Sequence, residues 1–295
     1  GIILNTRPKK SAEAYQKIWW DEGSPLIVIS ERLKEKVQKK TTAPIALAMR
    51  YGNPDIASAL AKLANDNARK LLVLPVYAQY SGTTTASIFD AVTKELHHWR
   101  WVPELRFINS YHDNKAYINA LANSVKAHWQ EHGKSKKLLM SFHGIPKRNL
   151  IMGDPYYCQC HKTARLLAAA LGLQEDEWLL SFQSRFGKAE WLKPYTSNTL
   201  RNLAKEGEDS VDIICPGFAI DCLETLEEIE VENREVFLQA GGKNYHYIPA
   251  LNDSKDHVEA LHSIIQQHIQ GWETEQSTAA MAQREQLALS KGADG

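Results

Sequence analysis

The feature that most constrains the fold is a regular alternation of short apolar runs with longer amphipathic stretches. Runs such as 71–76 have the length of buried strands, and stretches such as Lys115–His132 carry apolar residues at helical spacing. This alternation predicts an α/β protein with parallel sheets covered by helices on both faces. The expected strands are 45–49, 71–76, 105–108, 138–142, 178–182, 211–215 and 245–248, and the expected helices are 56–68, 87–98, 115–132, 163–171, 199–206 and 223–240.

The chain of 295 residues is long enough for two domains. The polar segment 131–137 is the best candidate for the boundary. We therefore expect two doubly wound parallel-sheet domains with a cleft between them. The first covers 1–130 and is joined by a C-terminal helix at about 254–272, and the second covers 131–253. The remaining segment, 273–295, is expected to be a polar helix or a frayed tail.

Composition excludes several classes of protein. The 35 basic and 35 acidic residues cancel, which argues against nucleic-acid binding. No apolar stretch approaches the roughly 20 residues of a membrane span, and no secretory signal is visible. The four cysteines are too few for a disulfide scaffold and lack zinc-site spacing, so we expect a cytoplasmic protein with simple thiols. They are Cys158, Cys160, Cys215 and Cys222.

Ligands of doubly wound sheets bind beyond the carboxyl ends of the strands, so the residues after each strand carry the functional information. His143 follows the predicted strand 138–142 and precedes Gly144 and Pro146, which favour a turn. Imidazole accepts a proton near neutral pH and is a good ligand for iron. The alternative is that His143 caps the strand end by hydrogen bonding.

A second candidate group follows the predicted strand 211–215. Asp221 and Glu224 have the spacing of a capping box at a helix N-terminus. Glu224, Glu228 and Glu232 are spaced i, i+4 and i+8, and therefore share one face of a helix. These carboxylates form either a solvated acidic face or a row that passes a cation or protons into a site.

Two further strand ends carry suggestive residues. The hydroxyl-rich turn 77–85 could bind a carboxylate or phosphate through backbone amides, or could simply cap a helix. The segments 183–187 and 191–196 supply aromatic rings and Arg185, which suit a flat anionic ligand or ordinary packing.

Taken together, these segments resemble the ferrochelatase family, which implies two Rossmann-like domains with the active-site cleft between them. The matching blocks run in order from about residue 7 to 265, and their residues are most similar to those of enzymes from Gram-negative bacteria. They are 23–26, 49–54, 75–81, 141–146, 182–187, 191–196 and 215–226.

The resemblance implies insertion of Fe²⁺ into protoporphyrin IX to form protohaem, the terminal step of haem biosynthesis. It implies that His143 and Glu224 are the catalytic residues and contact the metal, and that Glu228 and Glu232 relay protons or cations. The positions that match the porphyrin-binding residues of the family are Arg50, Tyr51, Tyr80 and Trp191.

The chain departs from the family pattern in two places. Cys222 stands where many members have a histidine, and the usual N-terminal strand with its pocket-forming turn is not recognised. We therefore expect a form that lacks this strand. The tail contains no cysteine, so no iron–sulfur cluster is expected.

Iron is expected as a substrate, with no organic cofactor. The expected partners are protoporphyrin IX and ferrous iron, with no nucleic acid. A monomer is expected, and a transient association with a membrane stays open. The alternatives are a related chelatase for coproporphyrin or a sirohydrochlorin-type ring, and a porphyrin or haem carrier without turnover.

Overall fold

The computed structural model describes residues 15–272 and 278–293. The expectation of a missing N-terminal strand concerns residues outside these ranges. The described part of the tail contains the helix α11 (Thr278–Ser290), as expected for a polar helix rather than a frayed end. None of the helices in the described ranges is both long and apolar enough to cross a bilayer.

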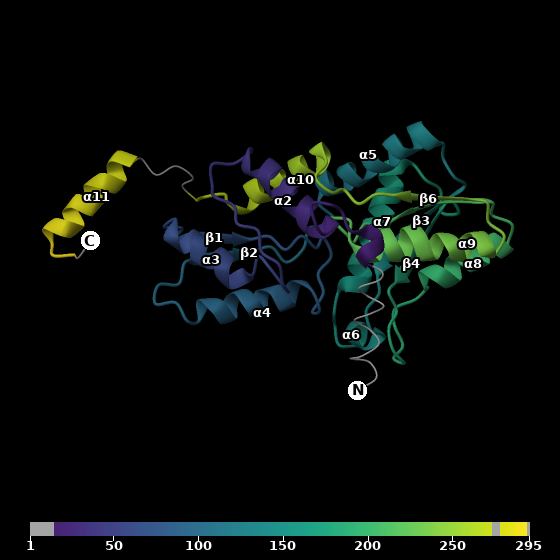
Figure 1. Cartoon of the computed structure of the whole chain (residues 1–295), viewed down its shortest axis with the longest axis horizontal. Coiled ribbons are helices and arrows are strands. Elements are labelled where there is room, and N and C mark those ends of the chain that lie inside the picture. Colours follow the sequence, from purple (N-terminus) through teal and green to yellow (C-terminus); the bar gives the residue numbers. More distant parts are fainter. Residues whose placement is uncertain (1–14, 273–277, 294–295) are drawn as a thin grey trace.

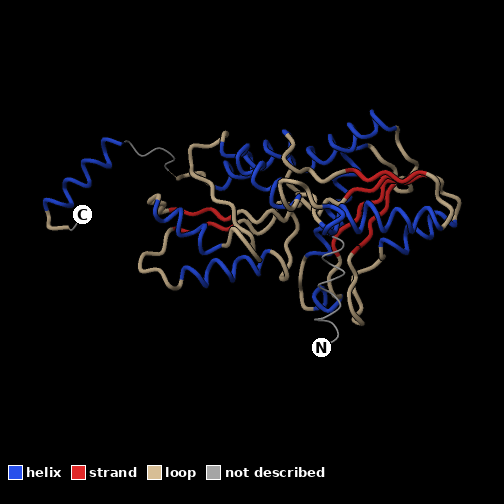
Figure 2. Tube along the Cα trace, in the orientation of Figure 1, coloured by secondary structure: helices blue, strands red, loops and turns tan. Residues whose placement is uncertain are grey.

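All the paired strands are parallel, which confirms the predicted fold class. One sheet contains β1 (Lys70–Val73) and β2 (Glu104–Phe107). The other has the order β4-β3-β5-β6. Its strands are β3 (Lys137–His143), β4 (Trp178–Gln183), β5 (Ser210–Ile214) and β6 (Asn244–Ile248). Figures 1 and 2 show the two sheets in opposite halves of the molecule.

The smaller sheet has helices on both faces because its strand side chains alternate. Leu71 packs with α3 (Ile56–Asn65) and α4 (Thr85–Leu96). Leu72 points to the other core, which contains residues of α2 (Pro25–Gln38) and α10 (Lys255–His268).

The larger sheet is covered in the same way. Met140 of β3 faces a core that includes α5 (Lys115–His132) and α7 (Tyr156–Leu171). Its neighbour Leu139 packs on the opposite side with α8 (Thr196–Lys205) and α9 (Arg234–Gln239). The short helix α6 (Lys147–Ile151) follows β3. Helix α10 packs against both α5 and α2 and so connects the halves, although the domain boundaries themselves stay a prediction.

The predicted strand 45–49 is wrong. Ile45 N donates to Gln38 Oε1 at 2.8 Å, and Met49 N donates to Pro54 O at 2.7 Å. These amides are therefore satisfied by a side chain and a turn instead of a strand ladder. Only an isolated bridge between Met49 and Asp55 is formed.

The predicted helix over 223–240 is confirmed, but it is not an α-helix throughout. The segment begins as a π-helix, η1 (Glu224–Asn233), and continues as α9. The side-chain amide of Asn233 donates to the carbonyl oxygen of Glu228 at 2.8 Å, five residues earlier, which supports the wider turn. Such turns are frequent at functional sites.

Candidate active site

Strand β3 carries His143 to the carboxyl edge of the larger sheet, where it is half-buried. Its Nδ1 lies 2.6 Å from the carbonyl oxygen of Gly144. Because a carbonyl oxygen can only accept, Nδ1 is the donor in this contact, and Nε2 carries the lone pair whenever the imidazole is neutral. The ring centroids of Trp191 and Phe218 lie 6.5 and 6.2 Å from that of His143. His143 therefore presents a base or metal ligand between aromatic rings.

Gly144 holds the loop after His143 against the neighbouring strand. Its N–H donates to the carbonyl oxygen of Gln183 at 2.8 Å, and Leu192 N donates to Ile145 O at 3.0 Å. A Cβ on Gly144 would lie 2.7 Å from that carbonyl oxygen and 3.1 Å from Cε3 of Trp191. Only glycine therefore allows this approach, which places Trp191 beside His143.

Replacing Gly144 with alanine is expected to destabilise the fold by about 1–3 kcal/mol, because the added methyl group overpacks the loop. Urea unfolding followed by circular dichroism measures this change. Gly82→Ala is the matched control, since its Cβ would meet only Asp154 Oδ2 at an ordinary 3.5 Å. Equal unfolding midpoints for the two variants would contradict the argument.

The loop after β5 places Glu224 at the same edge of the sheet, because β5 and β3 are neighbours. Asp221 in this loop is buried and accepts hydrogen bonds from Thr225 Oγ1 at 2.9 Å and Asn252 Nδ2 at 2.7 Å. The helix that begins at Glu224 has no side-chain cap. The capping-box interpretation of Asp221 and Glu224 is therefore wrong, and Asp221 instead fixes the loop that leads to Glu224.

The carboxylate of Glu224 lies near side chains from both halves of the chain. Burial raises the pKa of the Cys222 thiol well above its ordinary value, and the charge of Glu224 and a hydrogen bond to it raise it further. Burial, followed by Cys222 and Glu224, also raises the pKa of Tyr77, which follows β1 in the other half. Burial, and to a smaller extent the charge of Glu224, also raise the pKa of Tyr15. Glu224 therefore faces a region lined by neutral thiol and phenol groups.

Glu228, the next carboxylate of the predicted row, is held by the end of β4. Glu228 Oε1 accepts from Ser184 N at 2.6 Å, and Glu228 also accepts from Ser184 Oγ and, at 3.4 Å, from Gln183 Nε2. Gln183 Nε2 donates to the carbonyl oxygen of Glu224 at 2.9 Å as well. Glu228 and Glu232 both line a cavity of about 370 Å³, and Glu224 is not among its lining residues.

Gln183 is the positioning residue that the sequence analysis missed. It is 3% exposed, and its Oε1 accepts from Ser141 Oγ at 2.8 Å, while its amide nitrogen reaches the π-helix. The available signal was a polar side chain at the end of an otherwise apolar strand. Such a residue inside a buried sheet must find partners.

The four side chains expected to line the porphyrin pocket do not all lie next to one another. Arg50 Nε donates to Ser87 Oγ at 2.8 Å, and its guanidinium lies 4.5 Å from the ring centroid of Tyr51. Tyr51 is 79% exposed and contributes to the raised pKa of Tyr77, so it lies on the Glu224 side. Trp191 lies beside His143. Tyr80 lines a different cavity, of about 500 Å³.

The turn 77–85 does bind a carboxylate, which comes from the chain itself. Asp154 Oδ2 accepts from Gly82 N at 2.8 Å and from Ser81 Oγ at 2.9 Å. Thr84, which precedes α4, makes no side-chain cap. The turn therefore ties the first half of the chain to the segment before α7.

A family model described as Ferrochelatase matches residues 1–269. The chain belongs to the ferrochelatase family. Curated ferrochelatases include that of Thioalkalivibrio sulfidiphilus, 55% identical over 278 residues, which cover 92% of this chain and 75% of the relative. Another, from Hydrogenovibrio crunogenus, is 54% identical over 296 residues, which cover 98% and 78%. The expected likeness to enzymes of Gram-negative bacteria is confirmed.

Solved structures of chelatases share this fold at low sequence identity. SirB from Bacillus subtilis with Fe³⁺ has a TM-score of 0.64 and 12% identity, over 86% of this chain and 96% of SirB. The sirohydrochlorin chelatase SirB from Bacillus subtilis subspecies spizizenii, in complex with cobalt, has a TM-score of 0.59 and 10% identity, over 81% and 87%. At such identity the likeness concerns the fold alone.

Proposed function

We propose that this ferrochelatase-family chain inserts Fe²⁺ into protoporphyrin IX to form protohaem. The observation that carries the proposal is the hydrogen bond from His143 Nδ1 to the carbonyl oxygen of Gly144, which directs Nε2 to the reaction beside Trp191 and Phe218. Aromatic side chains suit the face of a flat macrocycle, and a free imidazole nitrogen suits proton and metal transfer.

The reaction exchanges two pyrrole N–H protons of the porphyrin for one Fe²⁺ ion. A bent macrocycle exposes its nitrogens to the metal, so binding the bent form favours the transition state. His143 Nε2 accepts one pyrrole proton, and the Glu224 carboxylate accepts the other from the opposite side. Each of the two groups contacts the metal only before it takes up its proton.

Cys222 changes the surroundings of Glu224 relative to family members with histidine at this position. Since its thiol pKa is raised well above the ordinary value, Cys222 stays protonated and serves as a hydrogen-bond donor to Glu224. We therefore assign Cys222 no role as a base. His143 and Glu224 accept the two pyrrole protons.

Glu228 and Glu232 are proposed to pass Fe²⁺ or protons along the cavity that they line. Glu232→Gln is expected to raise the KM for Fe²⁺ about two- to fivefold with little change in kcat, the effect of one partly exposed charge interaction. Initial rates over a range of Fe²⁺ concentrations measure this. Glu235→Gln, an exposed carboxylate of α9 outside the cavity lining, is the control. An unchanged KM in Glu232→Gln would remove Glu232 from the relay.

We propose that Arg50, Tyr51, Tyr80 and Trp191 contact the porphyrin. Rates of Fe²⁺ insertion into protoporphyrin IX, coproporphyrin and sirohydrochlorin under identical anaerobic conditions test the substrate assignment. We expect protoporphyrin IX to react fastest. Faster insertion into another ring would change the substrate assignment to that ring. Tight haem binding without any insertion would indicate a carrier.

We further propose that the protein works as a monomer in the cytoplasm and touches a membrane briefly to collect its apolar substrate. Support for the contact comes from the end of α6, where Ile151 and Met152 are 75% and 82% exposed. Two adjacent exposed apolar side chains on a protruding turn suit an apolar surface.

A further inference from the structure

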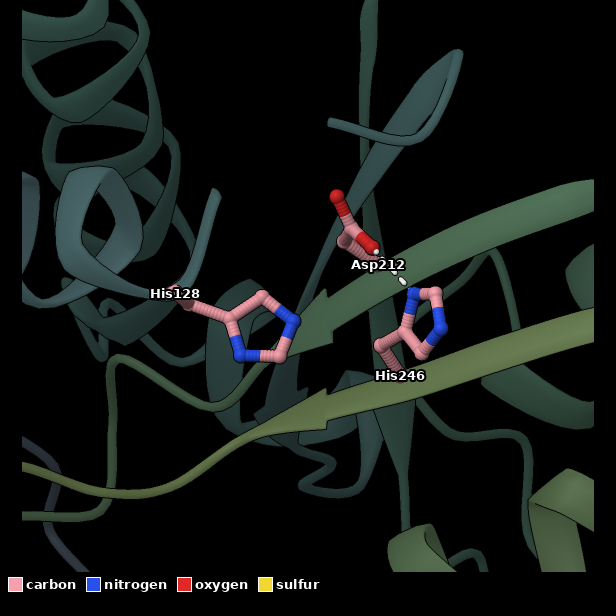
Figure 3. Close-up of side chains that lie close together, drawn as sticks. All are labelled: His128, Asp212 and His246. Carbon is pink, nitrogen blue, oxygen red and sulfur yellow. Dashed lines mark hydrogen bonds and ion pairs between the residues drawn. The ribbon is translucent and has the colours of Figure 1, made fainter. Parts of the chain in front are cut away.

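A second group of metal-ligand side chains lies under α5, away from His143. His128 of α5, Asp212 of β5 and His246 of β6 each offer one ligand atom, and these atoms lie within 4.8 Å of one another. Figure 3 shows both imidazoles next to the carboxylate. Asp212 and His246 lie in the middle of their strands, whereas His143 ends β3. The group therefore does not belong to the candidate active site.

The carboxylate of Asp212 is held firmly in place. Asp212 is fully buried, and its Oδ2 accepts from Trp129 Nε1 at 2.7 Å and from Ser135 N at 3.0 Å. Its Oδ1 accepts from Ser135 Oγ at 2.7 Å and lies 3.1 Å from Nδ1 of His246. Outer partners of this kind orient a ligand carboxylate in metal sites.

The spacing of Asp212 and His246 suits a shared ion. Two ligand atoms that each lie about 2.0–2.1 Å from a tetrahedral Zn²⁺ ion are roughly 3.3 Å apart. The observed 3.1 Å between Oδ1 and Nδ1 is close to this value. An ion between them would take the lone pair of the deprotonated Nδ1 in place of the present hydrogen bond.

His128 supplies the third ligand and lacks a partner of its own. Its Nε2 is buried without a hydrogen bond, although buried polar atoms are almost always paired. The unprotonated nitrogen of an imidazole is the form that binds metals. His132 stacks on His128 with ring centroids 4.4 Å apart and closes the group on the solvent side.

We propose that His128, Asp212 and His246 bind one divalent transition-metal ion, of the class that prefers imidazole and carboxylate ligands, such as Zn²⁺ or Fe²⁺. The three ligands come from one helix and two strands. The bound ion therefore links α5 to the larger sheet and stabilises their packing. Two imidazoles and one carboxylate leave the remaining position to water.

Anaerobic titration with Co²⁺ tests the site directly, because Co²⁺ bound by imidazole nitrogen absorbs visible light. The His143→Ala chain is used, so that the active-site histidine adds no signal. We expect a band that saturates at one equivalent, and its loss when His128→Ala or His246→Ala is added. His98→Ala, an exposed histidine of the other half, is the control and should keep the band.

Thermal unfolding gives an independent readout with Zn²⁺ as the ligand. We expect Zn²⁺ to raise the unfolding temperature of the His143→Ala chain, and to have no effect once His128→Ala or His246→Ala is added. With His143 intact, iron insertion by the His128→Ala and His246→Ala single variants should equal that of the parent, since neither residue touches the candidate active site. The proposal is overturned if no Co²⁺ band saturates at one equivalent, or if the band persists in both variants.

Discussion

Replacing His143 with alanine is expected to lower the rate of Fe²⁺ insertion by about 10²- to 10⁴-fold, the usual contribution of a positioned acid or base. The substitution removes the one nitrogen that the hydrogen bond to Gly144 leaves free at the edge of the sheet. Initial rates follow from the loss of porphyrin fluorescence under anaerobic conditions, at saturating porphyrin and iron.

The control for this variant is His97→Ala, which removes an exposed histidine at the end of α4. Both variants should give the circular dichroism spectrum of the parent, since neither side chain belongs to a buried core. Turnover by a folded His143→Ala protein within a few-fold of the parent would remove His143 from the chemistry.

Replacing Asp221 with alanine is expected to cost about 3–5 kcal/mol of unfolding free energy. Its carboxylate accepts hydrogen bonds from the side chains of Thr225, Tyr247 and Asn252 and from the backbone N–H of Ala250. The substitution leaves these buried donors unpaired, and each unpaired group costs about 1–3 kcal/mol before relaxation. Urea unfolding at constant pH measures the change.

The matched control is Asp253→Ala, which removes a carboxylate from an ion pair with Lys36 at the surface. Exposed pairs of this kind contribute about 0–1 kcal/mol. Asp221→Ala should therefore unfold at clearly lower urea than Asp253→Ala. It should also lose activity at temperatures where it is still folded, because Asp221 fixes the loop before Glu224. Equal stability of the two variants would show that the Asp221 network is not the anchor of this loop.

The parts of the fold that depend on local pattern were predictable from the sequence. The apolar runs 138–142, 178–182 and 211–215 became β3, β4 and β5, because a continuous apolar run of that length must be buried on both faces. The amphipathic stretch that was expected over Lys115–His132 has those bounds in the structure, with Asn114 as a cap that accepts from Ala116 N.

The parts that depend on distant partners were not predictable. Ile45 and Met49 carry strand-like residues, yet their amides bond to a side chain and a turn. The π-helix contains a hydrogen bond from the Asn233 side chain to the carbonyl oxygen of Glu228, and no periodicity rule distinguishes it from an α-helix. Asp221 fits a capping box by spacing, but partners 26 and 31 residues away decide its role.

The candidate site was predictable to a similar degree. The ends of β3 and β5 place His143 and Glu224 at one edge of a parallel sheet, as strand order alone requires. Gln183 was missed because its hydrogen bonds reach two other elements. The His128, Asp212 and His246 group was missed for the same reason, because each ligand comes from a different element.

The most direct test of the central claim is a single turnover of iron insertion. The purified protein is loaded with protoporphyrin IX and mixed with Fe²⁺ without oxygen, while the porphyrin and haem absorption bands are followed. We predict that the porphyrin bands give way to those of protohaem far faster than in a protein-free mixture, and that His143→Ala removes this acceleration. Conversion no faster than in the protein-free mixture, by folded and porphyrin-loaded protein, would contradict the account.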